Sequence, residues 1–597
     1  MRSSRLPRSL VALAAAVALA VGVGVAPASA HPPRPGHGDK VPVATGYGGA
    51  VATVDADATR VGIDVLRQGG NAVDAAVAAA ATLGVTEPFS SGIGGGGFFV
   101  YYDAASGQVH TIDGRETAPM AMTSDAFVED GVPIPFADAV TSGLSVGVPG
   151  TPRTWATALE QWGSLDLRRA LRGATEVARR GFVVDQTFAD QTTANAARFA
   201  AFRSSSDLFL RRGAAPEVGS VFRNRDLAKT YDLLARRGVD ALYTGRLAEE
   251  IVRTVQDPPV RRHSPLVVRP GLLELGDLAS YEAPLRAPTT VSYRGLDVYG
   301  MAPPSSGGST VGEALNILEA SLPEDADPTQ TLHHYLEASA LAFADRNRYV
   351  GDPAFVDVPL EQLLSDGFAK ERACLIDPEA ALPKPVAPGV PDGVYDAECP
   401  IASTGTEGSD GQSTTHLTTA DRWGNVVSYT LTIESLGGNG IVVPGRGFLL
   451  NNELTDFNFT DTQGGVDPNL PGPGKRPRSS MAPTIILEDG RPFLALGSPG
   501  GSTIITTVLQ VLVNRLELEM ELPDAVAAAR ASQRNTVAVQ AEPAFDRAAL
   551  QALGHTFTDT PEIGAVTGIE FQDDGSLLAV AEPVRRGGGS AAVVHGR

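Results

Sequence analysis

A threonine-rich stretch at residues 411–421 carries the clearest chemical signal in the sequence. Thr414 stands where a polar run ends and a strand-like alternation begins, so it is predicted to open a strand directly after a loose segment. If the bond between Ser413 and Thr414 is cut, the Thr414 hydroxyl can act as a nucleophile and its own α-amine as the base. An α-amino group has a pKa of about 7.7–8.0, which leaves a neutral fraction at neutral pH. The pattern predicts an enzyme whose nucleophile is a hidden N-terminus and which needs no separate histidine.

Two glycine-rich motifs suggest other chemistry but stand in the wrong context. Residues 92–97 match GxGxxG, yet a predicted helix precedes them and a predicted strand follows, which reverses the order of a dinucleotide-binding motif. We expect these glycines to permit a close backbone approach. Residues 143–147 match the GxSxG nucleophile elbow, but Val-Pro-Gly follows where that motif needs an immediate helix. Ser145 is therefore expected in a turn.

His333 and Glu337 stand one helical turn apart, a spacing that suits a pair of metal ligands. The sequence offers no third ligand nearby, so we expect a solvated helix face without a metal. No cofactor is expected.

The composition describes a globular chain with an acidic surface. Its 597 residues are 43% hydrophobic and 20% charged, which is ample for a large core. The formal net charge of −21 argues against a nucleic-acid partner or an anionic membrane surface.

Residues 1–30 have the pattern of a secretory signal peptide. Three arginines open the segment, an apolar stretch covers 10–25, and Ala-Ser-Ala ends it at Ala30. A retained membrane anchor is the alternative, but the apolar run is shorter than the ~20 residues of a spanning helix. No later segment is long and apolar enough to span a bilayer. The mature chain is expected to be secreted or extracytoplasmic.

Cys374 and Cys399 are the only cysteines. In an exported protein such a pair favours a disulfide, here one that closes a loop just before Thr414. Two free thiols are the alternative.

Periodicity and turn signals place the other elements. Asn71 is a predicted N-cap, residues 383–413 form a predicted mobile tether, and residues 414–421 and 426–433 form a predicted hairpin. The remaining predictions are helices at 51–68, 72–85, 503–516 and 523–529, a mainly helical region at 165–372, and strands at 98–103, 109–113, 448–451, 484–487 and 493–496.

Most of the mature chain resembles the γ-glutamyltranspeptidase family. No single motif is specific, but seven occur in the family's order. The segments that carry the resemblance are 69–76, 114–116, 303–308, 414–416, 449–457, 475–481 and 497–502.

This resemblance implies an α+β, four-layer αββα sandwich of the N-terminal nucleophile hydrolase type. It implies a precursor that cuts itself before Thr414, giving a large subunit (31–413) and a small catalytic subunit (414–597) that stay associated. The family's activity is transfer of the γ-glutamyl group of glutathione or a related donor to water or to an amino acid or peptide.

The resemblance also assigns roles at the site. Thr430 matches a threonine that assists the nucleophile, and Gly500 and Gly501 match a turn that forms the oxyanion hole, which suits two glycines before a helix. A γ-glutamyl head group is a zwitterion, so its site must offer both charges. The expected ligands of the α-carboxylate are Arg115, Ser479 and Ser480, and those of the α-ammonium are Glu453 and Asp456.

Two departures from the family bear on specificity. Thr432 stands where the family commonly has an asparagine near the head group, with Glu434 close by. The segment 456–479 is short for a lid and contains no tyrosine, so we expect an open, wetter site that favours hydrolysis and bulkier donors.

Two other functions compete with this one. An acylase of the same fold could act on β-lactam side chains such as a glutaryl-cephalosporin, although Arg115 with Asp456 favours a free amino-acid head group. A secreted binding protein could keep the scaffold without the chemistry, although intact Thr414, Gly500 and Gly501 argue against it.

Overall fold

The computed structural model describes residues 40–395, 413–465 and 467–596. Thirteen strands within these ranges form one hydrogen-bonded sheet in the order β8-β3-β2-β12-β11-β1-β19-β18-β14-β13-β10-β9, with β20 also paired to β1. Their bounds are β1 Val43–Thr53, β2 Gly96–Asp103, β3 Gln108–Gly114, β8 Leu285–Arg286, β9 Thr289–Tyr293, β10 Leu296–Gly300, β11 Thr415–Asp421, β12 Val426–Thr432, β13 Thr484–Glu488, β14 Arg491–Gly497, β18 Thr567–Phe571, β19 Leu577–Ala581 and β20 Ser590–Gly596.

Strand β1 divides this sheet into two layers. Residues 43–46 pair with β19, whereas residues 49–53 pair with β11. Gly48 and Gly49 lie between these segments with φ of 84° and 128°, which glycine adopts readily, and the pairing with β20 shifts register here. The two halves then face each other. Ser428 Oγ of β12 donates to the Leu496 carbonyl of β14 at 2.9 Å, across the interface.

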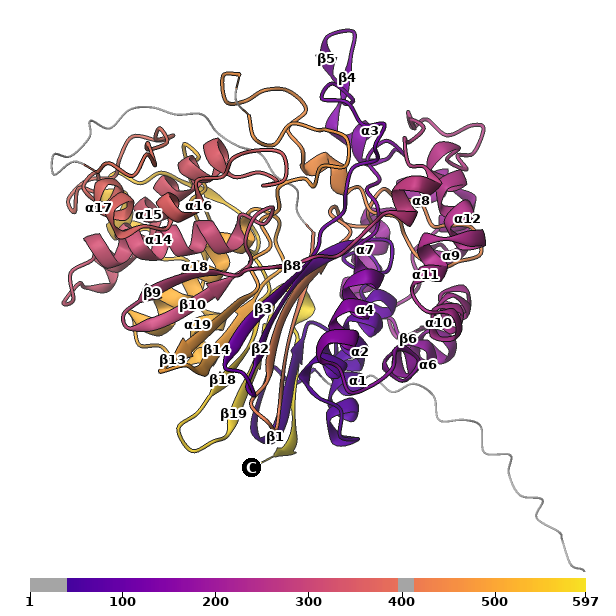
Figure 1. Cartoon of the computed structure of the whole chain (residues 1–597), viewed down its shortest axis with the longest axis horizontal. Helices are drawn as coiled ribbons and strands as arrows, with labels where there is room; N and C mark the ends of the chain where they lie inside the picture. Colours follow the sequence, from indigo (N-terminus) through magenta and orange to yellow (C-terminus); the bar gives the residue numbers. More distant parts are fainter. Residues whose placement is uncertain (1–39, 396–412, 466, 597) are drawn as a thin grey trace, which may run out of the picture.

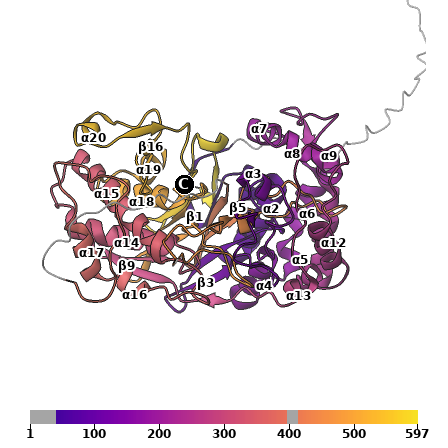
Figure 2. The ribbon, with the colours of Figure 1, turned by 90° about the horizontal axis from the view of Figure 1, so that it is seen from above.

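Helices cover both outer faces (Figures 1 and 2). On one side α1 packs on β1, and α2 packs on β11 and β12; on the other, α14 packs on β9 and β10, and α18 on β14. The main helices of the first side are α1 Ala56–Arg67, α2 Ala72–Thr86, α4 Thr151–Trp162, α6 Arg172–Arg180, α10 Arg225–Arg237 and α12 Gly245–Gln256, and those of the second are α14 Gly307–Ser321, α15 Pro328–Tyr349, α17 Asp366–Ala373, α18 Thr503–Leu516 and α19 Leu522–Ala527. This arrangement confirms the predicted α+β class and its αββα layers.

Shorter elements complete the described fold. The helices are α3 Phe136–Val140, α5 Leu167–Ala170, α7 Gln186–Ala194, α8 Ala196–Ala201, α9 Arg203–Phe209, α11 Asp240–Tyr243, α13 Leu275–Ala279, α16 Leu360–Leu363 and α20 Ala548–Ala552, with 3-10 turns at Glu453–Asp456 and Arg585–Gly587. The strands are β4 Val128–Glu129, β5 Val132–Pro133, β6 Phe182–Val183, β7 Val221–Phe222, β15 Ala531–Ser532, β16 Val539–Ala541 and β17 Phe557–Asp559.

Helix α2 shows how local sequence sets the core. Asn71 and Asp74 form the capping box at its start, which confirms the predicted N-cap. All of its residues are buried, as an alanine and valine helix under a sheet should be. The Ala72 N–H donates to Asp421 at the end of β11 (2.9 Å), so the helix start holds the central hairpin.

Two predicted elements were wrong. Residues 51–53 end β1 and are not helical, because the helix begins only after Asp55, which caps it through the Ala58 N–H at 2.8 Å. Residues 448–451 form a loop with one isolated bridge, Val442 to Leu449, instead of a strand.

The described part of the predicted tether, residues 383–395, makes hydrogen bonds with the small-subunit region of the chain. The Val386 N–H and carbonyl bond the Asn535 side chain at 2.7 and 2.9 Å. Residues 396–412 lie outside the described ranges, as does the predicted signal peptide.

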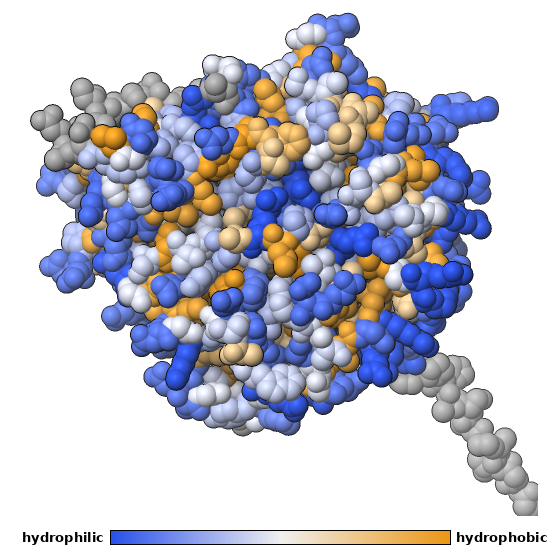
Figure 3. Space-filling model, in the orientation of Figure 1, coloured by the Kyte–Doolittle hydropathy of each residue, from blue (hydrophilic) through white to orange (hydrophobic). Residues whose placement is uncertain are grey.

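The described helices include none with the length and hydrophobicity needed to cross a membrane. Hydrophilic and hydrophobic side chains are interspersed on the face shown in Figure 3.

Candidate active site

The hairpin of β11 and β12 places two hydroxyl groups on one carbonyl. His416 pairs with Thr430 in the register, so the next step outward sets Thr414 opposite Thr432. The Thr414 hydroxyl, 3% exposed, donates to the Ser413 carbonyl oxygen. The Thr432 hydroxyl donates to the same oxygen at 2.9 Å and lies 3.5 Å from Thr414 Oγ1. The predicted nucleophile therefore lies against the predicted cleavage bond, with a second donor on that carbonyl.

Thr430 does not make the contact predicted for it. Its hydroxyl lies 2.8 Å from His416 Nδ1, and His416 Nε2 lies 3.2 Å from the Thr418 hydroxyl. Burial lowers the pKa of His416 to about 3, so its ring is neutral. The ring bridges the Thr430 and Thr418 hydroxyls between the two layers of the sheet. Thr432, one side-chain pair further along β12, is the threonine that contacts Thr414 and the Ser413 carbonyl. Which threonine assists the nucleophile stays a prediction.

Arg115 and the two residues predicted to bind the α-ammonium, Glu453 and Asp456, line one cavity with Thr414. The fully buried guanidinium donates to Glu453 and Asp456. It also donates from Nε to the Pro477 carbonyl (3.1 Å) and from Nη2 to the Arg478 carbonyl (3.0 Å). The residues predicted for opposite ends of a zwitterion are thus paired with each other here.

Four carboxyl groups lie near Arg115, and Arg478 also lines the cavity. Glu116, Glu434 and Glu453 are buried, whereas Asp456 is half-buried. Burial raises the pKa of Glu116 and of Glu434 to about 8, and it raises the pKa of Glu453 well above its ordinary value. Both Glu116 oxygens and Glu453 Oε2 have no hydrogen-bond partner among the described residues. A cavity of this kind favours a cationic group.

Ser479 and Ser480 line the same cavity. The loop 303–308 holds them, because the Ser306 N–H and hydroxyl both bond the Ser479 carbonyl at 2.7 Å. Buried Arg346 donates to the Ser480 hydroxyl (2.7 Å) and to the Ser306 hydroxyl (2.8 Å). Arg346 was not among the predicted site residues, and it positions Ser480 and Ser306 from α15.

Gly500 and Gly501 form the turn between β14 and α18, with φ of 141° and 58°. A Cβ added at Gly500 would lie 2.6 Å from the Thr503 hydroxyl, so both conformation and space require glycine. Gly501 lines the cavity of Thr414, and Gly500 lines an adjoining groove; Ser413 lines both. Their oxyanion-hole role stays a prediction.

Arg586 is a site residue that the sequence analysis missed. It donates to the Thr414 carbonyl at 2.6 Å and to the Ser90 hydroxyl at 2.7 Å, and it pairs with Glu87 at 3.3 Å. The one local signal for this residue is the pair of arginines that precedes three glycines at 587–589.

The two glycine motifs pack as expected. A Cβ at Gly95 would lie 2.0 Å from the Thr432 carbonyl, so residues 92–97 allow the backbone to approach the site strand. The buried Ser145 hydroxyl donates to the Ser142 carbonyl at 3.0 Å and stays within its turn.

The short lid segment reaches the cavity only at its two ends, through Asp456, Arg478 and Ser479. Among its described residues, none of 457–477 lines the cavity. Asp467 holds the segment through Asn458 (2.7 Å) and Thr462 (2.7 Å), and Phe459 stacks on Phe127 with ring centres 4.4 Å apart.

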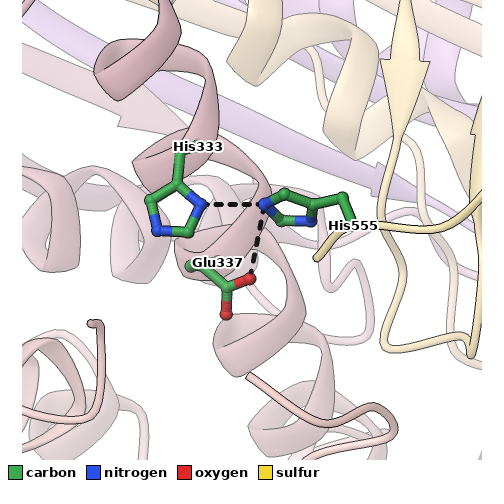
Figure 4. Close-up of side chains that lie close together, drawn as sticks. All are labelled: His333, Glu337 and His555. Carbon is green, nitrogen blue, oxygen red and sulfur yellow. Dashed lines mark hydrogen bonds and ion pairs between the residues drawn. The ribbon is translucent and has the colours of Figure 1, made fainter. Parts of the chain in front are cut away.

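The solvated face predicted for His333 and Glu337 was wrong. Both side chains are buried, and His555 joins them as a third group with metal-compatible spacing (Figure 4). However, Lys384 bonds both Glu337 oxygens at 2.7 Å, and His333 bonds His555 (2.8 Å) and the Asp377 carbonyl (2.9 Å). These contacts give the side chains of the cluster hydrogen-bond partners without an ion. They also connect Lys384, at the start of the predicted tether, through Glu337 and His333 to His555 near the C-terminus.

Cys374 is disulfide-bonded. Its predicted partner, Cys399, lies outside the described residues, so the pairing stays a prediction.

The layers and the threonine before β11 define an N-terminal nucleophile hydrolase fold. The model of the gamma-glutamyltranspeptidase family matches residues 58–592, and the chain belongs to that family. It is 39% identical over 555 residues to the glutathione hydrolase proenzyme of Bacillus subtilis, covering 91% of this chain and 92% of that protein.

Acylases are also similar to this chain. The acylase ACY 1 proenzyme of a Pseudomonas species is 36% identical over 90% of this chain and 92% of its own length. The crystal structure of the cephalosporin acylase from Bacillus halodurans superimposes with a TM-score of 0.81 at 31% identity, over 96% of this chain and 99% of that one.

The buried carboxyl of Glu434 should make stability fall as pH rises. Its pKa is about 8 in the folded protein against an ordinary 4.5, so between these values the folded state holds a proton that the unfolded chain has released. In this window each pH unit lowers the free energy of unfolding by about 1 kcal/mol. Between pH 5 and 8 the thermal unfolding temperature should therefore fall less steeply for Glu434→Gln than for the wild type.

Glu324→Gln, on an exposed loop, is the control and should follow the wild type. Parallel profiles for Glu434→Gln and the wild type would show that Glu434 ionises normally.

Proposed function

We propose that this chain is an exported precursor that cleaves itself between Ser413 and Thr414 and then transfers γ-glutamyl groups from glutathione or related donors to water or to an amine. The observation that carries the proposal is the convergence of the Thr414 and Thr432 hydroxyls on the Ser413 carbonyl. The family relationship supports the reaction class.

Self-cleavage follows from this geometry as an acyl shift. Thr414 Oγ1 attacks the Ser413 carbonyl carbon, the C–N bond breaks, and the hydroxyl proton ends on the Thr414 nitrogen. The Thr432 hydroxyl, 2.9 Å from the carbonyl oxygen, stabilises the negative charge that develops there. Water then hydrolyses the ester, which frees Thr414 as an N-terminal residue.

In the mature enzyme the freed α-amine is the base for the Thr414 hydroxyl. The attacked carbonyl is then the γ-amide of the donor. Arg586, bonded to the Thr414 carbonyl, fixes the nucleophile, and the Gly500–Gly501 turn supplies N–H donors to the oxyanion.

The charge balance of the cavity favours a γ-glutamyl head group. Its α-ammonium would compensate the carboxyl groups near Arg115, while its α-carboxylate can bond Arg115 and the Ser479 and Ser480 hydroxyls. Without the ammonium, Glu116 and Glu434 stay protonated at neutral pH, because burial raises their pKa to about 8.

An acylase for glutaryl-type β-lactam side chains is the second candidate, because acylases are among the similar proteins. A glutaryl group has the same carboxylate and carbonyl but no ammonium. The excess of carboxyl groups therefore favours the γ-glutamyl donor.

The nucleophile assignment predicts the state of the purified protein. Wild-type protein should give two fragments, the smaller beginning at Thr414, whereas Thr414→Ala should stay one chain. Intact mass and N-terminal sequencing measure this. A single stable wild-type chain would support the non-catalytic binding protein instead.

The contact of Thr432 with the Ser413 carbonyl predicts a kinetic difference between neighbouring threonines. Thr432→Val removes a donor to the attacked carbonyl and should slow self-cleavage about 10²- to 10³-fold. Thr430→Val, the matched control on the same strand, leaves His416 without one partner and should lower stability by about 1–3 kcal/mol while cleavage continues. The rates are measured by following the appearance of fragments on a gel in newly synthesised protein. Slower cleavage in Thr430→Val than in Thr432→Val would support Thr430 as the assisting threonine.

The charge argument predicts head-group selectivity. Wild-type enzyme should hydrolyse γ-glutamyl-p-nitroanilide with a kcat/KM about 10- to 100-fold above that of glutaryl-p-nitroanilide, the value of a hydrogen bond to a charged group. Equal or faster glutaryl hydrolysis would replace the γ-glutamyl proposal with the acylase.

A further inference from the structure

A second, larger groove adjoins the cavity of Thr414. It has a volume of about 540 Å³, which is ample for a dipeptide-sized group. Its walls come from α7, from the turn at Gly500, and from residues 560–564 and 586–587 near the C-terminus. Ser413 lines both spaces, so the predicted cleavage bond lies at their junction.

This position gives the two spaces different parts of a substrate. The cavity of Thr414, here called the head cavity, is small and lined by charged and polar side chains, among them Arg115, Asp456, Ser479 and Ser480. Gly501 belongs to that cavity and Gly500 to the groove, so an acyl carbonyl at this turn lies between them. The group on the far side of the γ-amide must therefore extend into the groove.

The exposed charge of the groove is acidic. Asp190 accepts a hydrogen bond from the Gln186 amide (2.7 Å), and Glu562 accepts one from the Arg586 backbone N–H (3.1 Å). Both donors are neutral, and the described residues place no lysine or arginine side chain in an ion pair with either carboxylate. The nearby cations have other partners: Arg586 pairs with Glu87 at 3.3 Å, and Lys40 with Asp185 at 3.5 Å.

We propose that this groove binds the amine side of the reaction, the leaving group of the donor and the incoming acceptor, and that Asp190 and Glu562 make it select for positive charge. The inference rests on the proposed function. When Thr414 Oγ1 bonds the γ-carbonyl carbon and the C–N bond breaks, the amine takes the proton from the Thr414 α-amine and departs through the groove. An acceptor amine enters by the same route and returns a proton to Thr414 on transfer.

The test compares two donors of nearly equal shape, γ-glutamyl-arginine and γ-glutamyl-citrulline, which differ in one leaving-group charge. The amino acid released by processed enzyme is quantified by chromatography to give kcat/KM. For the wild type at low salt, the arginine-to-citrulline ratio should be about three to ten, as expected for two exposed carboxylates. In Asp190→Asn/Glu562→Gln the ratio should fall to about one. Glutamine at 562 keeps an acceptor for the Arg586 N–H, so the change removes charge alone.

Glu324→Gln/Asp325→Asn is the matched control. It removes two exposed carboxylates from the loop between α14 and α15, outside the groove, and should keep the wild-type ratio. A second measurement needs no variant: added salt at about 0.5 M should bring the wild-type ratio close to one by screening.

A wild-type ratio near one, or a ratio that the double variant and salt leave unchanged, overturns the groove assignment. Failure of the wild type to cleave γ-glutamyl-p-nitroanilide as well as both peptides is a different result. It overturns the proposed function and this inference with it.

Discussion

The register of the β11–β12 hairpin is the constraint on which the site depends. It sets Thr414 opposite Thr432, so two hydroxyls reach one carbonyl without a flexible segment between them. Asp421 fixes that register, because it bonds the turn at Asn425 and the first N–H of α2. A slip of one residue would turn every side chain of the strand to the opposite face. Chemistry here is therefore a consequence of strand pairing.

The head cavity differs from an ordinary protein core because ionisable carboxyl groups are buried around it. Burial raises the pKa values of Glu116 and Glu434 to about 8, so these carboxyl groups hold protons that they would release in water at neutral pH. A ligand with an ammonium group relieves this imbalance, whereas folding alone does not. The groove beyond Ser413 also carries carboxyl groups, those of Asp190 and Glu562, but they are exposed and screened by solvent. Both spaces therefore attract cationic groups, the first strongly and the second weakly.

Local patterns in the sequence predicted the parts of the site that local physics determines. The hairpin, the Asn71 cap and the glycine turn before α18 all follow from neighbouring residues. The contact of Thr432 with Thr414 was predictable too, because counting back from the Ala420 to Val426 pair sets Thr432 opposite Thr414. Arg586 was not predictable, since it meets Thr414 across 172 positions of chain. His333 and Glu337 misled for a similar reason: their partner, His555, lies 222 positions from His333.

Interleaved strands explain how a cut before Thr414 can leave one folded body. In the sheet, β11 and β12 lie between β1 and β2, and β13 lies between β10 and β14, so segments from either side of the cut alternate. Breaking one peptide bond removes none of these ladder hydrogen bonds. Val386 bonded to Asn535, and His333 bonded to His555, add links at the end of the first segment. The proposed cleavage would therefore free an amine at Thr414, while strand pairing would hold the two segments together.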